Sequence, residues 1–176
     1  MVIRTRKNGQ IFHKYRGVYY PDYLNKGNAS SFISSKAKEY CNGRGIDIGA
    51  DKWPQPGAIA ILNETSQNAY KLDNFADNSL DYVFSSHCLE HLDNWQDALS
   101  LWISKIKPDG ILFLYLPHKT MRLWNRGEPW VGFDHKWIPE AEIVNSFLVK
   151  NGMKIIEYNP DKDNYWSFHI VAKKIS

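Results

Sequence analysis

The sequence predicts an α/β fold: a three-layer sandwich on a mostly parallel sheet, with an antiparallel C-terminal hairpin and a first crossover helix that is shortened or absent. Short apolar strands alternate with helical segments, as such a sandwich requires. The segment Ile111–Leu116 has little polar alternation, which suits a strand buried on both faces of a parallel sheet. Two strand-like segments near the C-terminus follow each other without a helix, which predicts an antiparallel pair.

Length and composition fit one domain. The chain has 176 residues, of which 43% are hydrophobic and 14% aromatic, so it can bury a sizeable core. A net charge of +3 is too mild to indicate nucleic acid by itself. The two cysteines form no CxxC pair, which argues against a disulfide framework or a zinc cluster. Neither a secretory signal nor an apolar run of the ~18 residues that span a membrane is visible. We expect a soluble, cytoplasmic protein.

The first 27 residues predict an irregular basic arm, and residues 28–176 predict a single domain. A basic arm can bind an anionic surface, although a solvated leader is the commoner explanation. Asn28 or Ser30 can cap a helix that continues to about Cys41, where Asn42-Gly43 ends it. The basic residues of the arm face one acid, Asp22, and are Arg4, Arg6, Lys7, Lys14, Arg16 and Lys26.

The rest of the domain predicts alternating strands and helices. A stripe of apolar residues from Trp95 to Ile106 predicts an amphipathic helix. The "KPDG" segment that follows it predicts a turn. A second helix is expected over Ile138–Gly152, with a proline in its first turn. The expected strands are Gly45–Gly49, Ala58–Leu62, a weaker one at Ala69–Leu72, Asn78–His87, the "ILFLYLP" run from Ile111, Met153–Tyr158 and Ser167–Lys173.

Three segments carry a family resemblance. "GIDIGA", "LDNFADNSLDYVFSSHCLEHL" and "IKPDGILFLYLPH" resemble, in order and spacing, signature segments of class I S-adenosylmethionine-dependent methyltransferases. The middle segment is most similar to those of a small group with an "LEHL" motif. The resemblance spans residues 43–118 and implies a Rossmann-like sandwich with S-adenosyl-L-methionine as cofactor.

The end of the first strand is the expected centre of the cofactor site. A strand that ends in Gly49 lets the backbone approach a ligand closely, because no Cβ intrudes. The resemblance implies that Asp47 lies near the cofactor's ammonium group, with Ile48 and Ala50 beside the same turn. Alternatively, Gly49 only makes a turn and Asp47 caps a neighbouring backbone group.

The second strand departs from the family pattern. The family usually ends this strand with an acid that accepts hydrogen bonds from the ribose, whereas this chain has Leu62 at that position. Glu64 or Asn63 could replace the acid. The 24 residues from Gly49 to Asp73 leave no room for a full crossover helix in the usual ~30-residue unit.

The resemblance assigns two further groups of cofactor contacts. Leu72 would form an apolar wall for the adenine, and Asp73 or Asn74 would accept from its amino group. A plain turn rich in Asp and Asn is the alternative. Ser86 and His87 are expected at the carboxyl end of a central strand, where open α/β sheets bind ligands.

Histidines are the candidates for catalysis. A hydroxyl acceptor would benefit from a base with a pKa near neutral, whereas a nitrogen or carboxylate acceptor would need none. We favour His118 first and His135 second, and we expect His91 to be structural, ordering its loop together with Glu90.

A metal site could combine Asp134-His135 with His118 and His87. Without an HxxxH pair or a cysteine partner, however, the sequence does not favour one, and we predict no metal.

The favoured function is methyl transfer from S-adenosylmethionine to a small molecule or a glycan. The loop 118–137 holds Trp124, Trp130, Phe133 and Trp137, which suit a flat or sugar-like acceptor or simply cap the sheet. One alternative is a degenerate protein without catalysis that acts as a binding module. The presence of Leu62 where the family has its ribose acid favours this alternative. The other is a nucleic-acid methyltransferase that uses the basic arm. A nicotinamide dehydrogenase is less favoured, because there is no GxGxxG.

Overall fold

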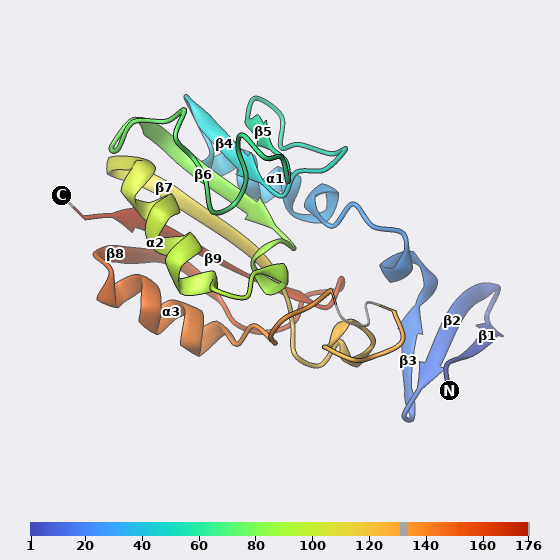
Figure 1. Cartoon of the computed structure of the whole chain (residues 1–176). Coiled ribbons are helices and arrows are strands. Elements are labelled where there is room, and N and C mark those ends of the chain that lie inside the picture. Colours follow the sequence, from blue (N-terminus) through green and yellow to red (C-terminus); the bar gives the residue numbers. More distant parts are fainter. Residues whose placement is uncertain (131–133, 176) are drawn as a thin grey trace.

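A computed structural model of the chain describes residues 1–130 and 134–175 (Figure 1). Its centre is a six-stranded sheet in the order β5-β4-β6-β7-β9-β8. The first four of these strands are parallel, and β9 runs antiparallel to both of its neighbours. The strands are β4 (Gly45–Ile48), β5 (Ile59–Ile61), β6 (Leu80–Ser86), β7 (Ile106–Pro117), β8 (Met153–Asn159) and β9 (Ser167–Lys174).

Helices cover both faces of this sheet, so the three-layer prediction is confirmed (Figure 1). α2 (Trp95–Lys105) and α3 (Ala141–Lys150) bury the larger core, which contains Val83, Leu114 and Ile170. α1 (Ser30–Tyr40) covers the other face, where Ile33 and Ala37 pack against aromatic residues of the strands. Neighbouring strand residues alternate between the two cores because successive side chains of a strand point to opposite faces.

The first crossover helix is absent, as the spacing predicted. Residues 49–58 are all described, and they form turns and irregular backbone between β4 and β5. Two prolines lie in this segment, and proline lacks the N–H that a helix interior needs. Because no helix fills the space, the loop lies beside the carboxyl end of β4.

Four local expectations were wrong. Ala69–Leu72 is not a strand, since its neighbourhood has only an isolated bridge between Asn68 and Lys71. "KPDG" is not a free turn but part of β7, where the pairing with β6 is shifted and Asp109 has a positive φ of 62°. No side chain caps α1, because Ala29 precedes it.

The fourth expectation concerned residues 1–27, which are not irregular. They form an antiparallel sheet of β1 (Ile3–Lys7), β2 (Gln10–Tyr15) and β3 (Val18–Pro21), which lies away from the main sheet (Figure 1). Asn8-Gly9 is a typical hairpin turn that the sequence analysis overlooked, because the strands it joins are short and alternate weakly. Our division of the chain into an arm and a domain stays a prediction.

The small N-terminal sheet is attached to the loop after β7. Tyr15 and Tyr20 pack with Met121 and Leu123 in a separate buried cluster. The Tyr15 hydroxyl donates to Glu128, and Arg16 pairs with the same carboxylate at 3.0 Å. These contacts hold the loop against the end of the main sheet. Among the described residues, no helix is long and apolar enough to cross a membrane.

We predict that Trp102 is a main stabiliser of the fold. Its ring is completely buried, and its indole N–H donates to the Ala69 carbonyl at 2.8 Å. Trp102→Phe should lower the free energy of unfolding by about 1–3 kcal/mol, because the carbonyl loses its partner. Trp102→Ala should cost about 3–5 kcal/mol. Urea unfolding measures both, and the half-exposed Trp53, changed to Phe, is the control expected to stay within about 0.5 kcal/mol. An unchanged midpoint for Trp102→Ala would contradict this account.

Candidate functional site

The candidate site lies at the carboxyl ends of β4 and β6, where the chain turns at Gly49 and at His87. Gly49 has a positive φ of 82°, and a Cβ added there would lie 2.5 Å from the Cβ of Cys88. Glycine is therefore required at this position for two reasons, backbone conformation and close packing. His87 also has a positive φ, of 49°, so the loop after β6 bends sharply toward the Gly49 turn.

Two cavities meet at this bend. The first has a volume of about 380 Å³ and lies between the Gly49 turn, the segment before α1 and the loop after β7. The second has a volume of about 410 Å³ and lies on the side of β5. Gly49, His87 and His91 line both cavities. The slot beside Gly49 is thus open, and Trp53, Trp124 and Trp130 form part of its wall.

Asp47 holds the loop that replaces the missing helix. Its carboxylate is buried and accepts a hydrogen bond of 2.7 Å from the Gln55 backbone N–H. The pKa of Asp47 is raised to about 7 by burial, although this hydrogen bond opposes the shift. The alternative that Asp47 caps a neighbouring backbone group is therefore correct for this hydrogen bond. Asp47 also lines the first cavity, so a ligand group can still approach its carboxylate.

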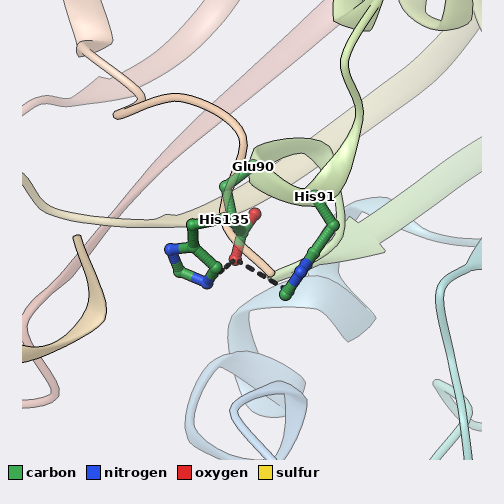
Figure 2. A group of neighbouring side chains, drawn as sticks. All are labelled: Glu90, His91 and His135. Atoms are coloured by element: carbon green, nitrogen blue, oxygen red, sulfur yellow. Dashed lines mark ion pairs between the residues drawn. The ribbon is translucent and has the colours of Figure 1, made fainter. Parts of the chain in front are cut away.

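A buried carboxylate with imidazoles beside it lines the first cavity, and Figure 2 shows it between two of these rings. Glu90, in the short helix η2 (Leu89–His91), is completely buried. Its Oε1 lies 3.8 Å from Nε2 of His135 and 4.0 Å from Nε2 of His91. Nδ1 of His87 is 3.6 Å from the same oxygen. Neither oxygen of Glu90 has a hydrogen-bond partner among the described residues.

Burial controls the charges in this group. It raises the pKa of Glu90 to about 8 and lowers the pKa of His87 and of His135 to about 3. The pKa of His91 is also lowered by burial. Each group is therefore held toward its neutral form, because a charge in this poorly solvated place costs free energy.

Three hydrogen bonds fasten the loop that carries His135 to η2. The Lys136 N–H donates to the Glu90 carbonyl at 2.8 Å, and the Trp137 indole donates to the Leu89 carbonyl at 2.9 Å. Nδ1 of His91 contacts the Asp134 carbonyl at 3.2 Å. Residues far apart in the sequence are thereby held as one constellation.

The structure brings together only part of the expected cofactor residues. Glu64 is exposed, and Leu72 is buried in the core. Asp73 points to solvent near Lys71, and the Asn74 amide donates to Gln67. These four do not line either cavity, whereas the residues that do are Asp47, Ile48, Gly49, Ala50, Asn63, Ser86 and His87.

The two expected catalytic histidines lie in different places. His135 is buried and lines the first cavity. His118 lies outside the residues that line either cavity, and its ring contacts the Thr120 hydroxyl at 2.8 Å. Of the aromatic loop, Trp124 and Trp130 line the first cavity, and Phe133 lies outside the described residues.

Sequence reasoning missed three parts of the site. Tyr70 lines the second cavity, and its hydroxyl accepts from the Asn94 N–H at 3.1 Å, which fixes the ring. The segment from Leu24 to Ser30 lines the first cavity, although it had been assigned to the arm and to a helix cap. Glu90 was expected only to order its loop. The "LEHL" order with the later "DHKW" could have signalled two of its imidazole neighbours, His91 and His135, but the fold is needed to place them together.

We predict that Asp47 makes stability depend on pH. Between pH of about 4 and 7 the folded chain retains a proton on Asp47 that the unfolded chain loses, so the free energy of unfolding falls as pH rises. Asp47→Asn keeps an acceptor for Gln55 but removes this proton. The stability gained by the variant should therefore increase with pH, by at most about 1.4 kcal/mol per pH unit. Urea unfolding at several pH values measures it, and parallel curves for the two proteins would refute it.

Comparisons with known proteins agree with this architecture. Residues 32–114 match the family model described as a methyltransferase domain. A comparison with curated proteins gave no match.

Three solved structures illustrate the similarity in fold. A methyltransferase from Thermotoga maritima is 14% identical, covering 86% of this chain and 92% of its own, with a TM-score of 0.61. One from Archaeoglobus fulgidus is 19% identical over 85% and 96%, with a TM-score of 0.57. The 1,6-didemethyltoxoflavin N1-methyltransferase of Burkholderia thailandensis, solved with S-adenosylhomocysteine, is 12% identical over 88% and 80%, with a TM-score of 0.60. At these identities the neighbours establish the fold alone. The family match over residues 32–114 and the likeness in fold both support a class I S-adenosylmethionine-dependent methyltransferase.

Proposed function

We propose that the chain is an enzyme that transfers a methyl group from S-adenosyl-L-methionine to a small-molecule or sugar acceptor. One observation carries the proposal: two cavities of different character converge on the Gly49 turn at the carboxyl end of β4. Open α/β sheets bind ligands at such ends. One cavity can hold the nucleoside and the other the amino-acid end together with the acceptor.

The second cavity suits the adenosine. Tyr70 provides a fixed aromatic wall, and Leu62 and Ile61 provide apolar surface. Asn63 is the polar side chain closest in sequence to the position where the family has its ribose acid. Its amide can accept a hydrogen bond from a ribose hydroxyl, which Leu62 cannot do.

The first cavity suits the amino-acid end of the cofactor. Asp47 can attract the ammonium group, and the buried Ser86 hydroxyl has no hydrogen-bond partner among the described residues. A buried hydroxyl without a partner costs free energy, so it marks a place where a ligand atom can bind. The residues present thus fit the cofactor despite the loss of the ribose acid.

The cofactor supplies a methyl group that is already activated by the positive sulfur. The remaining task of the chain is to align an acceptor and exclude water. Trp124, Trp130 and Tyr165 line the acceptor side of the first cavity and can stack on a flat ring or on the CH face of a sugar. His135 faces this cavity, so the geometry favours it over His118 as the histidine near the acceptor.

We also propose a cytoplasmic location. The cysteines Cys41 and Cys88 are free, which is typical of a reducing compartment.

Cofactor binding separates this proposal from the degenerate alternative. Titration calorimetry with S-adenosylhomocysteine should give one site per chain. Asn63→Ala should weaken binding by about tenfold, the effect of losing one hydrogen bond. Glu64→Ala is the matched control, since Glu64 lies next in the chain but does not line the cavity. No heat at millimolar ligand would favour a binding module that has lost the cofactor. A larger effect at Glu64 than at Asn63 would move the ribose contact to Glu64.

Turnover tests the two histidines. Transfer of a radiolabelled methyl group would be followed across nucleotide sugars and small aromatic metabolites. His135→Ala should lower the rate by about 100-fold or more, because it faces the acceptor cavity. His118→Ala should change it by less than about threefold. Full activity in both variants would remove histidine from the mechanism.

A further inference from the structure

We propose that Glu90, His91 and His135 form a binding site for one divalent transition-metal ion, and that this ion holds a hydroxyl of the methyl acceptor. The three residues come from η2 and from the loop before α3, and their side chains point toward one another (Figure 2). The site lies in the wall of the first cavity, next to the Gly49 turn.

The separations of the ligand atoms suit a shared ion. The imidazole nitrogens of His135 and His91 are 3.8 Å and 4.0 Å from Oε1 of Glu90, too long for hydrogen bonds. Two atoms that each bond one ion at about 2.1 Å lie at most about 4.2 Å apart. The potential ligand atoms of all three residues lie within 4.8 Å of one another, so small ring rotations complete the set.

The unpartnered carboxylate is the second, independent sign of a ligand. Glu90 is completely buried, and both of its oxygens lack a hydrogen-bond partner among the described residues. A buried polar group without a partner is rare in folded proteins, and a carboxylate is among the most costly. A cation between Glu90 and the imidazoles would satisfy it directly.

The surroundings orient the ligands as metal sites require. Nδ1 of His91 contacts the Asp134 carbonyl, which leaves Nε2 directed at Glu90. Metal-binding histidines commonly donate their second nitrogen to such a group, which fixes the ring and the tautomer. The backbone hydrogen bond from Lys136 to Glu90 fixes the loop that carries His135 against η2, which carries the other two ligands.

The donor set selects the class of ion. Two imidazoles and one carboxylate suit Zn²⁺, Fe²⁺, Co²⁺ or Ni²⁺, whereas Mg²⁺ and Ca²⁺ prefer oxygen ligands. Nδ1 of His87 lies 3.6 Å from the same Glu90 oxygen and could complete the set, although its Nε2 is held by Ser167 at 2.8 Å. His91 is the most exposed of the three ligands, so the remaining coordination positions open toward the cavity.

The acceptor role rests on the proposed function. A hydroxyl bound to the ion loses its proton to solvent more readily, because the cation lowers its pKa. The oxygen lone pair then forms the new C–O bond while the S–C bond breaks, and that electron pair stays on sulfur. In this proposal His135 acts as a metal ligand and not as a base, unlike our expectation from the sequence.

Metal binding is tested without any methyl transfer. The full chain is stripped with EDTA, dialysed and titrated with CoCl₂ or ZnCl₂ by calorimetry, with the visible spectrum of Co²⁺ as a second readout. We expect one ion per chain and much weaker binding of MgCl₂. Glu90→Gln and His91→Asn should each weaken Co²⁺ binding by about 100-fold or more. Circular dichroism checks that both variants fold. Because His91 is more exposed than Glu90, His91→Asn should fold even if Glu90→Gln does not, and it then carries the test alone.

Glu157→Gln is the matched control, because Glu157 contacts His169 at 2.7 Å outside the site and should leave Co²⁺ affinity unchanged. No binding at 100-fold excess of Co²⁺, or equal binding by native chain and ligand variants, would overturn the site. If the ion binds but its removal leaves methyl transfer at full rate, the acceptor role is overturned. Failure of S-adenosylhomocysteine to bind would instead count against the proposed function and leave the Co²⁺ result standing.

Discussion

The close contact between the Gly49 turn and Cys88 is the constraint on which the rest of the site depends. It brings the loops after β4 and β6 so near to each other that no side chain fits at position 49. The same bend directs His87 and the following η2 toward the cavities, because His87 itself takes a left-handed conformation. The positions of Glu90 and His91 follow from this local geometry.

The trimmed first crossover gives the protein an unusual site wall. A helix would normally stand after the Gly49 turn, but here an irregular loop is tied down by the bond from Gln55 to Asp47. The N-terminal sheet and the loop after β7 support the opposite wall through Tyr15, Glu128 and the buried cluster around Leu123. This side of the first cavity is thus built largely from segments outside the central sheet.

Much of the fold could be predicted from the sequence, because strands such as "ILFLYLP" and the stripe of α2 follow simple burial patterns. The missing helix followed from spacing and prolines. The N-terminal strands were missed although Asn8-Gly9 is a typical hairpin turn, and their packing on a loop about 100 residues away is not visible in the sequence. Of the residues that line the first cavity, Gly49, Asp47 and His135 could be predicted from motif and position. Tyr70 and the Glu90 constellation were missed because they depend on how loops pack in three dimensions.

We propose that the cofactor lies across both cavities at the Gly49 turn. The decisive measurement is a crystal structure grown with S-adenosylhomocysteine. We expect the sulfur beside Gly49, the adenine against Tyr70, and the amino-acid end near Asp47 in the first cavity. A ligand bound elsewhere, or cavities that close on themselves in the presence of millimolar ligand, would contradict it.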